Sequence, residues 1–268
     1  MTATVPLDDR GLLLGDGLFE TILALSGRPR FLDAHLARLG RGCAVLGLPA
    51  PDGAEVRRAI EAVLAADAGL AGGRAAVRVT WTAGSGGRGL DRPASPRPRL
   101  LVTAAAAPPP AGPASLVFAT VRRNQGSPAS RLKTLAYLDN VLARREALAA
   151  GADEAVMLNL AGELACAAAA NLFWLREGLL FTPALDCGVL DGIARAQVLD
   201  LAAAMGVDTA EARAGAGALA TAEAVFLTNS LTGVRGVGRI DGREMPPHPM
   251  TAALAAAWAR MAEAAAPL

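Results

Sequence analysis

Short runs of alternating hydrophobic and polar residues recur along the chain and predict β-strands. The predicted strands lie within residues 9–23 and at 75–82, 99–103, 116–122, 154–160, 171–175, 178–182 and 224–228. A turn signal at residues 27–29 follows the first of these strands and predicts a hairpin.

Helix signals fall between these strands. Asp33 is placed to cap one helix, and Asp52 to cap a second that runs to about Ala66, with Glu55 completing a capping-box pattern. Further helices are expected from about residue 192 to 205 and from about residue 250. Because helices and strands are mixed along the whole chain, the sequence predicts an α/β or α+β fold.

A proline-rich stretch at residues 107–113 divides the chain and is its clearest linker signal. It separates an expected N-terminal α/β domain, residues 1–106, from a larger expected C-terminal domain, residues 114–268. No internal repeat is visible in either part.

Composition narrows the function classes. The formal net charge of +1 argues against binding to nucleic acid or to an anionic membrane. The 3 cysteines are far apart and lack CxxC spacing, which indicates reduced thiols rather than disulfides or a zinc site. No signal-peptide core is found near the first residues, and the alanine-rich run at 252–266 is interrupted by Arg260 and Glu263. We therefore expect a soluble, cytoplasmic protein.

A glycine-rich segment at residues 84–89 formally matches the dinucleotide-binding pattern GxGxxG. That pattern needs a helix N-terminus directly after it to hold a pyrophosphate, and the residues that follow here are rich in proline. We therefore interpret the segment as a flexible loop, in which Arg88 is a candidate anion ligand.

Lysine is scarce in this chain, and arginine supplies nearly all of the positive charge. Lys133 stands on a short connector just ahead of a predicted apolar helix, whose helical spacing is carried by Leu135, Leu138, Leu142 and Ala149. One interpretation is a surface lysine at a helix start, although the helix dipole disfavours a cation there. The other is a buried, partly deprotonated amine that forms a Schiff base. The segment by itself leaves both open.

Two later loops have features of a phosphate site. Residues 188–195 bring glycines to a predicted helix N-terminus, where backbone N–H groups favour an anion. Residues 228–230 end a buried strand in hydroxyl and amide side chains. Either loop alone is a weak signal, but both loops, Lys133 and the helix that carries Arg38 together suggest a phosphate-bearing cofactor that needs an amine.

Five motifs in this order make the chain resemble a known family. They are Asp16-Gly-Leu-Phe-Glu-Thr21, His35-Leu-Ala-Arg-Leu39, Lys133-Thr-Leu-Ala-Tyr-Leu138 with its continuation to Arg144, Asn171-Leu-Phe173 and Gly188-Val-Leu-Asp-Gly-Ile193. This pattern resembles the class IV aminotransferase-like family, which binds pyridoxal 5′-phosphate. The similarity runs from about residue 8 to 240, and it implies a two-domain fold with the cofactor between the domains.

The resemblance also implies roles for individual residues. Lys133 would hold the cofactor and then move the α-proton of the substrate. Arg38, the amides of Ile193 and Ala194, and Ser230 with its neighbour Asn229 would bind the phosphate.

Tyr137 would face the phenolic oxygen of the cofactor. Arg122, Arg123 and Arg131 are candidates for binding substrate carboxylates near Lys133, with Arg123 preferred. The family also implies a small, amino-acid-like substrate and a homodimer with active sites near its interface.

One position departs from the family pattern. Where the family has a glutamate that keeps the pyridine nitrogen protonated, this chain has Cys166. Glu163 is expected to point to the opposite face, because it lies three positions away along an extended segment. A neutral thiol leaves the pyridine ring of the cofactor unprotonated, and the ring is then a poorer electron sink. This slows transamination more than it slows an elimination that is driven by formation of an aromatic product.

The residues in these motifs most resemble those of 4-amino-4-deoxychorismate lyase, which releases pyruvate and leaves p-aminobenzoate for folate synthesis. The alternatives are an aminotransferase acting on branched-chain or D-amino acids, and a degenerate cofactor-binding protein without turnover. Two lesser departures from the family pattern are Ala194, for a usual threonine, and Gly236, for a usual proline.

Overall fold

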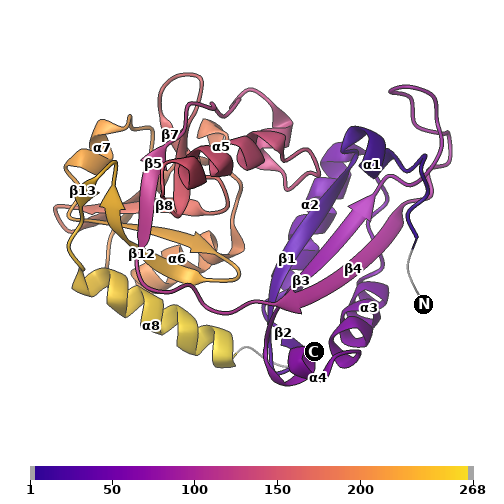
Figure 1. Cartoon of the computed structure of the whole chain (residues 1–268), viewed down its shortest axis with the longest axis horizontal. Helices are drawn as coiled ribbons and strands as arrows, with labels where there is room; N and C mark the ends of the chain where they lie inside the picture. The colour runs from indigo at the N-terminus through magenta and orange to yellow at the C-terminus, as the bar shows by residue number, and fades with distance from the viewer. Residues whose placement is uncertain (1–3, 265–268) are drawn as a thin grey trace. The chain divides into compact units, whose positions relative to one another are not determined.

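The structure is a computed structural model that describes residues 4–264. Its chain divides into two compact units, which can be followed by colour in Figure 1. Among the described residues, the first unit holds 4–108, Leu132–Ala136 and Ala264, and the second holds Pro109–Arg131 and Tyr137–Glu263. The first boundary falls within the predicted linker, while Leu132–Ala136 joins the first unit although the sequence-based division places it in the C-terminal domain.

The first unit is built on a four-stranded antiparallel sheet in the order β2-β1-β3-β4. Its strands are β1 (Gly17–Leu25), β2 (Arg28–Pro29), β3 (Arg74–Thr82) and β4 (Arg99–Ala106). Its helices are α1 (Arg10–Leu14), α2 (Leu32–Leu46), α3 (Gly53–Ala65) and α4 (Ala68–Gly72). The hairpin predicted at residues 27–29 is confirmed by the pairing of Leu25 with Arg28.

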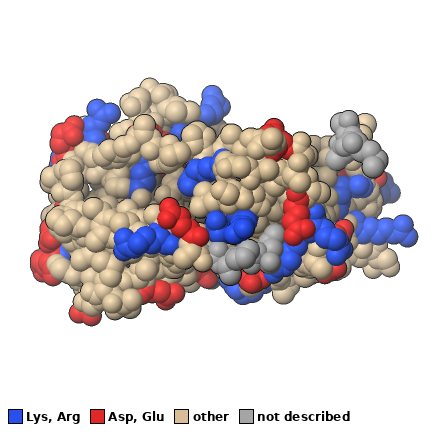
Figure 2. All heavy atoms as spheres, turned by 90° about the horizontal axis from the view of Figure 1, so that it is seen from below, with Lys and Arg blue, Asp and Glu red and all other residues tan. Residues whose placement is uncertain are grey.

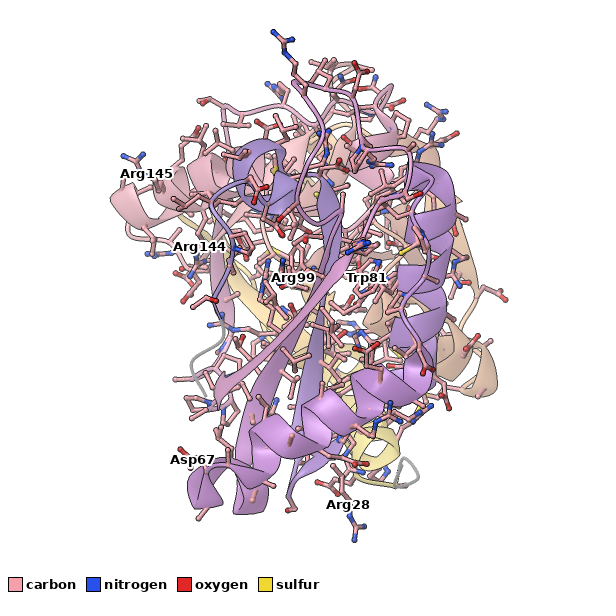
Figure 3. All side chains as sticks on the ribbon, turned by 90° about the vertical axis from the view of Figure 1, so that its right-hand side faces the viewer. Arg28, Asp67, Trp81, Arg99, Arg144 and Arg145 are labelled. Atoms are coloured by element: carbon pink, nitrogen blue, oxygen red, sulfur yellow. The ribbon has the colours of Figure 1, made fainter. Side chains whose placement is uncertain are left out.

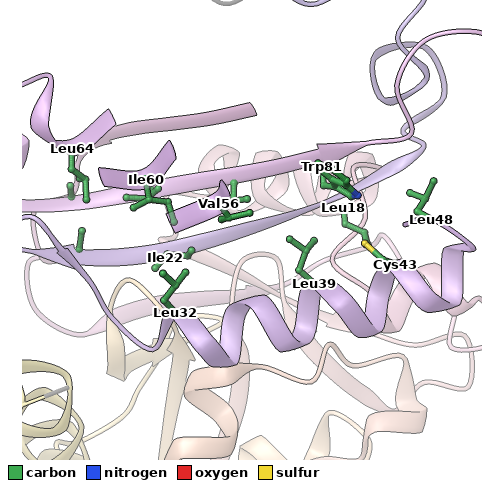
Figure 4. Close-up of a cluster of buried hydrophobic side chains, with 14 of the residues drawn as sticks. Leu18, Ile22, Leu32, Leu39, Cys43, Leu48, Val56, Ile60, Leu64 and Trp81 are labelled. Carbon is green, nitrogen blue, oxygen red and sulfur yellow. The ribbon is translucent and has the colours of Figure 1, made fainter. Parts of the chain in front are cut away.

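One face of this sheet forms the core of the first unit. Alternation along β1 turns Leu18 and Ile22 to the side covered by α2 and α3, where they pack with Leu39 and Ile60. Figure 4 shows this cluster, with Trp81 of β3 next to Leu18. Phe19 and Thr21 alternate with these residues and therefore stand on the opposite face of the sheet.

The two helix caps predicted in this unit have different outcomes. Asp52 caps α3, and its side chain accepts a hydrogen bond from the amide of Ala54. Asp33, however, lies inside the first turn of α2, and the cap position belongs to Phe31, whose φ is 56°. The prediction of an Asp33 cap is wrong because Asp33 instead pairs with Arg57 of α3.

The glycine-rich loop after β3 is not followed by a helix, so the argument against a dinucleotide site is confirmed. The loop is held in place rather than flexible, in contrast to the expectation. Arg10 donates from its amide to the carbonyl of Gly84 at 2.9 Å and from Nη1 to the carbonyl of Gly89 at 3.3 Å, so both ends of the loop are tethered to α1. Because the tethers come from residues distant in sequence, the loop's own composition gives no signal of them.

The second unit is built on a mixed sheet in the order β10-β9-β8-β11-β12-β5-β6-β7, with β13 paired to β12. Its strands are β5 (Ala114–Phe118), β6 (Glu154–Leu158), β7 (Leu164–Ala167), β8 (Asn171–Arg176), β9 (Leu179–Pro183), β10 (Thr209–Ala212), β11 (Ala224–Asn229), β12 (Gly233–Ile240) and β13 (Arg243–Glu244). Its α-helices are α5 (Leu138–Ala149), α6 (Ile193–Ala204), α7 (Gly217–Ala220) and α8 (Pro249–Ala264). Short 3₁₀ helices occupy Pro128–Arg131 and Leu185–Cys187.

The face of helix α5 that packs against the core is not the leucine-bearing face that the sequence predicts. It begins at Leu138, so Leu135 lies outside it, and Leu138 is 67% exposed. The buried positions are Asn140, Ala143 and Ala147. Small alanines let the helix approach β6 closely, which leaves the larger leucines toward solvent.

No helix in the described part of the chain is long and apolar enough to cross a membrane. On the face drawn in Figure 2, basic and acidic side chains are interspersed, as the small net charge leads one to expect. Residues 4–264 also contain no group of three or more His, Cys, Asp or Glu side chains that could hold a metal ion.

Candidate functional site

Lys133 lies in an extended segment that adds to the edge of β1. The amide of Phe19 donates to the carbonyl of Lys133 at 2.9 Å, and the amide of Leu135 donates to the carbonyl of Gly17 at 3.0 Å. Gly17 leaves room for this segment on one side and for β3 on the other, since a Cβ there would lie 2.9 Å from Cδ1 of Leu135 and 2.5 Å from the carbonyl oxygen of Trp81. Lys133 is therefore held by a strand edge, ahead of the first turn of α5, and it is the only lysine in the chain.

The side chain of Lys133 lies on the aromatic ring of Phe19. Its Nζ is 4.2 Å from the ring centroid, and the guanidinium carbon of Arg78 is 3.8 Å from the same centroid. Lys133 is half-buried, whereas Phe19 is buried. Lys133 therefore does not stand at a helix start, and its role as a Schiff-base amine stays a prediction.

A second group of polar side chains is buried on the helix-covered face of the same sheet. Arg38 of α2 donates from Nε to Oε1 of Glu20 at 2.8 Å and from Nη2 to Oε2 at 2.5 Å. His35 shares Oε2 through Nδ1 at 2.8 Å. Glu20 is 2% exposed, so this carboxylate orients two side chains of α2 from inside the core.

The protonation states in this group follow from burial and pairing. Burial by itself raises the pKa of Glu20, but hydrogen bonds from Arg38 and His35 outweigh it and bring the pKa to about 2. Burial lowers the pKa of His35 against the opposing effect of Glu20. His35 is thus neutral at neutral pH and donates its Nδ1–H to Glu20, while its buried Nε2 has no partner among the described residues.

In the second unit, Cys166 lies on β7 opposite Met157 and is 6% exposed. Burial raises the pKa of its thiol, Glu154 also raises it, and Arg123 lowers it. The side chain is therefore a neutral thiol at neutral pH. Glu163 does not substitute for it, because its carboxylate accepts from Asn159 at 2.7 Å and pairs with Arg213.

Helix α6 begins with an N-terminus that suits an anion. Its N-cap is Gly192, no side chain caps the first turn, and the first turn contains no acid, so the amides of Ile193 and Ala194 face no competing carboxylate from their own turn. A Cβ at Gly192 would lie 1.9 Å from Oδ1 of Asn171, so only glycine fits there. Asn171 also donates to the carbonyl of Leu190 at 2.9 Å, which fixes the loop that leads into the helix.

The end of β11 carries a second feature that fits a phosphate. The hydroxyl of Thr228 is buried and has no hydrogen-bond partner among the described residues. Asn229 uses its side-chain oxygen to accept from the amides of Leu231 and Thr232 and so shapes the turn that presents Ser230. An orphaned buried hydroxyl beside an uncapped helix N-terminus is chemically suited to phosphate oxygens. Thr228 belongs to the cluster predicted from the sequence with Asn229 and Ser230, but a hydroxyl at a strand end gives no signal of its missing partner.

The remaining predicted residues differ in how they are held. Tyr137, the only tyrosine, is half-buried and directly precedes α5. Arg88 is exposed in the tethered loop. Arg123 is buried and donates to the carbonyl oxygens of Gly188 and Ser130 and to Oδ1 of Asn140, so it ties together the loop before α6, the segment before Lys133 and helix α5.

That network gives Arg123 a positioning task within the second unit, and a contact with substrate remains a prediction. Arg122 and Arg131 are exposed, which is the ordinary environment of an arginine.

Comparison with known proteins accounts for the motifs and the fold. The sequence profile of the amino-transferase class IV family matches residues 17–240. The aminodeoxychorismate lyase of Bacillus subtilis is 30% identical over 226 residues, covering 83% of this chain and 77% of the relative. A putative branched-chain-amino-acid aminotransferase of Methanocaldococcus jannaschii is 33% identical over 246 residues, covering 90% of this chain and 84% of the relative.

Among solved structures, the 4-amino-4-deoxychorismate lyase of Pseudomonas aeruginosa matches with a TM-score of 0.85 and 34% identity, covering 95% of this chain and 94% of the other. The fold and the motif-bearing residues thus define a class IV aminotransferase-like enzyme. The chain belongs to the amino-transferase class IV family, whose members depend on pyridoxal phosphate. The expected family, fold class and cofactor are confirmed.

Proposed function

We propose that this protein is a pyridoxal-phosphate-dependent lyase that converts aminodeoxychorismate to pyruvate and p-aminobenzoate. The observation that carries this proposal is the buried neutral thiol of Cys166 at the position where the family has a glutamate. Similarity to aminodeoxychorismate lyases supports it independently.

The residues present fit pyridoxal phosphate. Lys133, as the only lysine, would hold the cofactor through its amine. Arg38, oriented by Glu20, would bind the phosphate together with the amides of Ile193 and Ala194, the hydroxyl of Ser230 and the turn formed by Asn229. Tyr137 would face the phenolic oxygen of the cofactor, and the thiol of Cys166 would face its pyridine nitrogen. When bound, the cofactor supplies an electron sink for the carbon that carries the substrate's amino group.

The proposed reaction needs one proton transfer and one bond cleavage. The released amine of Lys133 takes the proton from the ring carbon that carries the amino group. The bond between the adjacent ring carbon and the oxygen of the enolpyruvyl group then breaks, and enolpyruvate takes up a proton to become pyruvate. Loss of this group makes the ring of the product aromatic, and this supplies the driving force. The reaction therefore depends less than transamination does on a protonated pyridine nitrogen in the cofactor.

Pyruvate and p-aminobenzoate are the direct readouts. Purified protein loaded with pyridoxal phosphate should release both in equal amounts from aminodeoxychorismate, and it should transfer amino groups from leucine or D-alanine to 2-oxoglutarate slowly or not at all. Rapid amino transfer without pyruvate release would favour the second candidate, a branched-chain or D-amino-acid aminotransferase. That candidate is supported by the 33% identity to a putative aminotransferase. Cofactor binding with neither activity would indicate a degenerate binding protein.

The proposal includes a homodimer in the cytoplasm. Helix α1 and its flank expose a run of large apolar side chains, among them Leu7, Leu12 and Leu13, of which Leu7 is 86% exposed. Several large apolar side chains exposed close together in sequence favour burial against another chain. All 3 cysteines are buried and unbridged, which suits a reducing compartment. Sedimentation of wild-type protein and of Leu12→Asp and Leu13→Asp variants tests the dimer.

A further inference from the structure

The ring of Phe19 stands between two cations that come from opposite edges of β1. Lys133 pairs with β1 along one edge, since Phe19 donates to its carbonyl. Strand β3 pairs along the other edge, with Thr21 opposite Arg78. Phe19 and Thr21 share one face of the sheet, so the side chains of Lys133 and Arg78 reach the ring from either side.

Arg78 is held in this position by a neutral neighbour. Its Nε donates to the hydroxyl of Thr80 at 3.2 Å, two positions along the same strand and on the same face. The hydroxyl orients the guanidinium without cancelling its charge. The position of the guanidinium over the ring is thereby set by β3, independently of any cofactor.

The Phe19 ring and the guanidinium of Arg78 have opposite effects on the protonation of the Lys133 amine. The negative face of an aromatic ring attracts an ammonium group and favours the charged amine. A fixed guanidinium disfavours that charge, and the two ring distances, 4.2 and 3.8 Å, place the two cations close together. At a separation of about 8 Å or less, with an effective dielectric of about 20 to 80, the repulsion lowers a pKa by roughly 0.4 to 1.5 units.

Glu20, Arg38 and His35 bring further charged or titratable groups to the same sheet. On the far side of the sheet, Glu20 and Arg38 form a close pair with opposite charges, and His35 is neutral because burial lowers its pKa. Lys133 interacts electrostatically with His35, and because His35 is neutral it adds no repulsion to that of Arg78. Arg78 faces the amine from β3, on the same face of the sheet as the amine itself.

We propose that Arg78 tunes Lys133 by sharing the Phe19 ring with it, so that the ring holds the amine in place while the guanidinium lowers the free-energy cost of the uncharged form of the amine. An uncharged amine is required both to bind a carbonyl carbon and to accept a proton. Arg78 is a positioning residue in this proposal, which rests on the proposed function only in taking Lys133 as the reactive amine.

The single lysine makes a direct test possible. Reductive methylation of the cofactor-free protein with ¹³C-formaldehyde labels Lys133 and the terminal amine alone, and NMR titration gives the pKa of each. Arg78→Gln should raise the pKa of Lys133 by about 0.5 units or more, Arg78→Glu should raise it further, and Arg78→Lys should keep it near the wild-type value.

Arg28→Gln is the matched control because it removes the same charge from the same sheet. Arg28 is exposed on β2 opposite Leu25, six positions from Phe19 and about 20 Å along β1, and Figure 3 shows it at the other end of the sheet from Trp81. It should leave the pKa of Lys133 unchanged. An unchanged or lowered pKa in Arg78→Gln, or an equal rise in Arg28→Gln, overturns the proposal.

The outcome is separable from that of the proposed lyase activity, since no cofactor or substrate is present in the titration. A raised pKa in Arg78→Gln together with no pyruvate from the loaded wild-type enzyme would leave this inference standing and refute the proposed function. Arg78 is exposed, so these substitutions preserve the core, and near-ultraviolet circular dichroism confirms folding of each variant.

Discussion

Replacing Cys166 with glutamate supplies the carboxylate that the family resemblance implies for this position, and it should move the chemistry toward transamination. A carboxylate in contact with the pyridine nitrogen favours its protonated form, because opposite charges at contact stabilise the charged state. The buried surroundings of Cys166 strengthen such a pair relative to water.

The size of the effect follows from the environment of β7. A neighbouring opposite charge shifts a pKa by about 1 to 3 units, so the protonated fraction of the ring should rise about tenfold or more. Burial and Glu154 raise the pKa of an acid at this position, as they do for the thiol, while Arg123 lowers it. The larger side chain costs about 1 to 3 kcal/mol of stability through overpacking.

The assay is the single half-reaction with an amino acid donor, followed as conversion of the cofactor to its pyridoxamine form. Cys166→Glu should accelerate this conversion. Cys166→Gln has nearly the same size without the charge and is the matched control, and Cys166→Ser should change little because a hydroxyl is also neutral.

The opposite pattern, an inert Glu variant and an inactive Ser variant, would refute the reasoning. It would mean that the thiol acts chemically or does not face the ring nitrogen. The argument that a neutral ring suits a lyase would then fail.

Three further predictions concern single residues. In Lys133→Ala, borohydride reduction should leave no cofactor covalently attached to the protein, as measured by mass spectrometry. An adduct at wild-type stoichiometry would refute the assignment of Lys133, since the chain has no second lysine. Glu20→Gln should destabilise the protein by roughly 3 kcal/mol near neutral pH. Because the folded-state pKa of about 2 lies below the ordinary 4.5, that difference is complete above about pH 4.5 and should shrink as the pH falls toward 2 in urea unfolding, whereas a constant difference would contradict it. Gly192→Ala should weaken binding of pyridoxal phosphate at least tenfold in fluorescence titrations, because its Cβ would collide with Asn171; Gly217→Ala, where a Cβ would meet open space, is the control and should bind normally.

Much of the strand pattern was predictable because large β-branched and aromatic residues mark it. Strands β3, β8 and β11 lie within a residue or two of their predicted positions. Strands β7 and β12 were missed, since β7 is short and half alanine and β12 contains Gly236 and Gly238, which give no strand signal. Tertiary pairing stabilises both despite their weak propensity.

The candidate site was likewise only partly predictable from the sequence. The sequence motifs predict Lys133, Arg38 and Cys166 as site residues, but they do not predict which residues hold these side chains in place. The Glu20 carboxylate that orients Arg38 is separated from it by 18 positions, and Arg78 reaches the Phe19 ring from a strand some 60 residues further on. Contacts of such long sequence separation depend on strand register and helix packing, which a single sequence does not reveal.

The central claim is best tested by the products formed from aminodeoxychorismate. Stopped samples of the loaded enzyme, analysed by chromatography for p-aminobenzoate and by a coupled assay for pyruvate, should show equal amounts of both, and Lys133→Ala should form neither. p-Aminobenzoate or pyruvate no faster with wild-type protein than with Lys133→Ala would contradict the account.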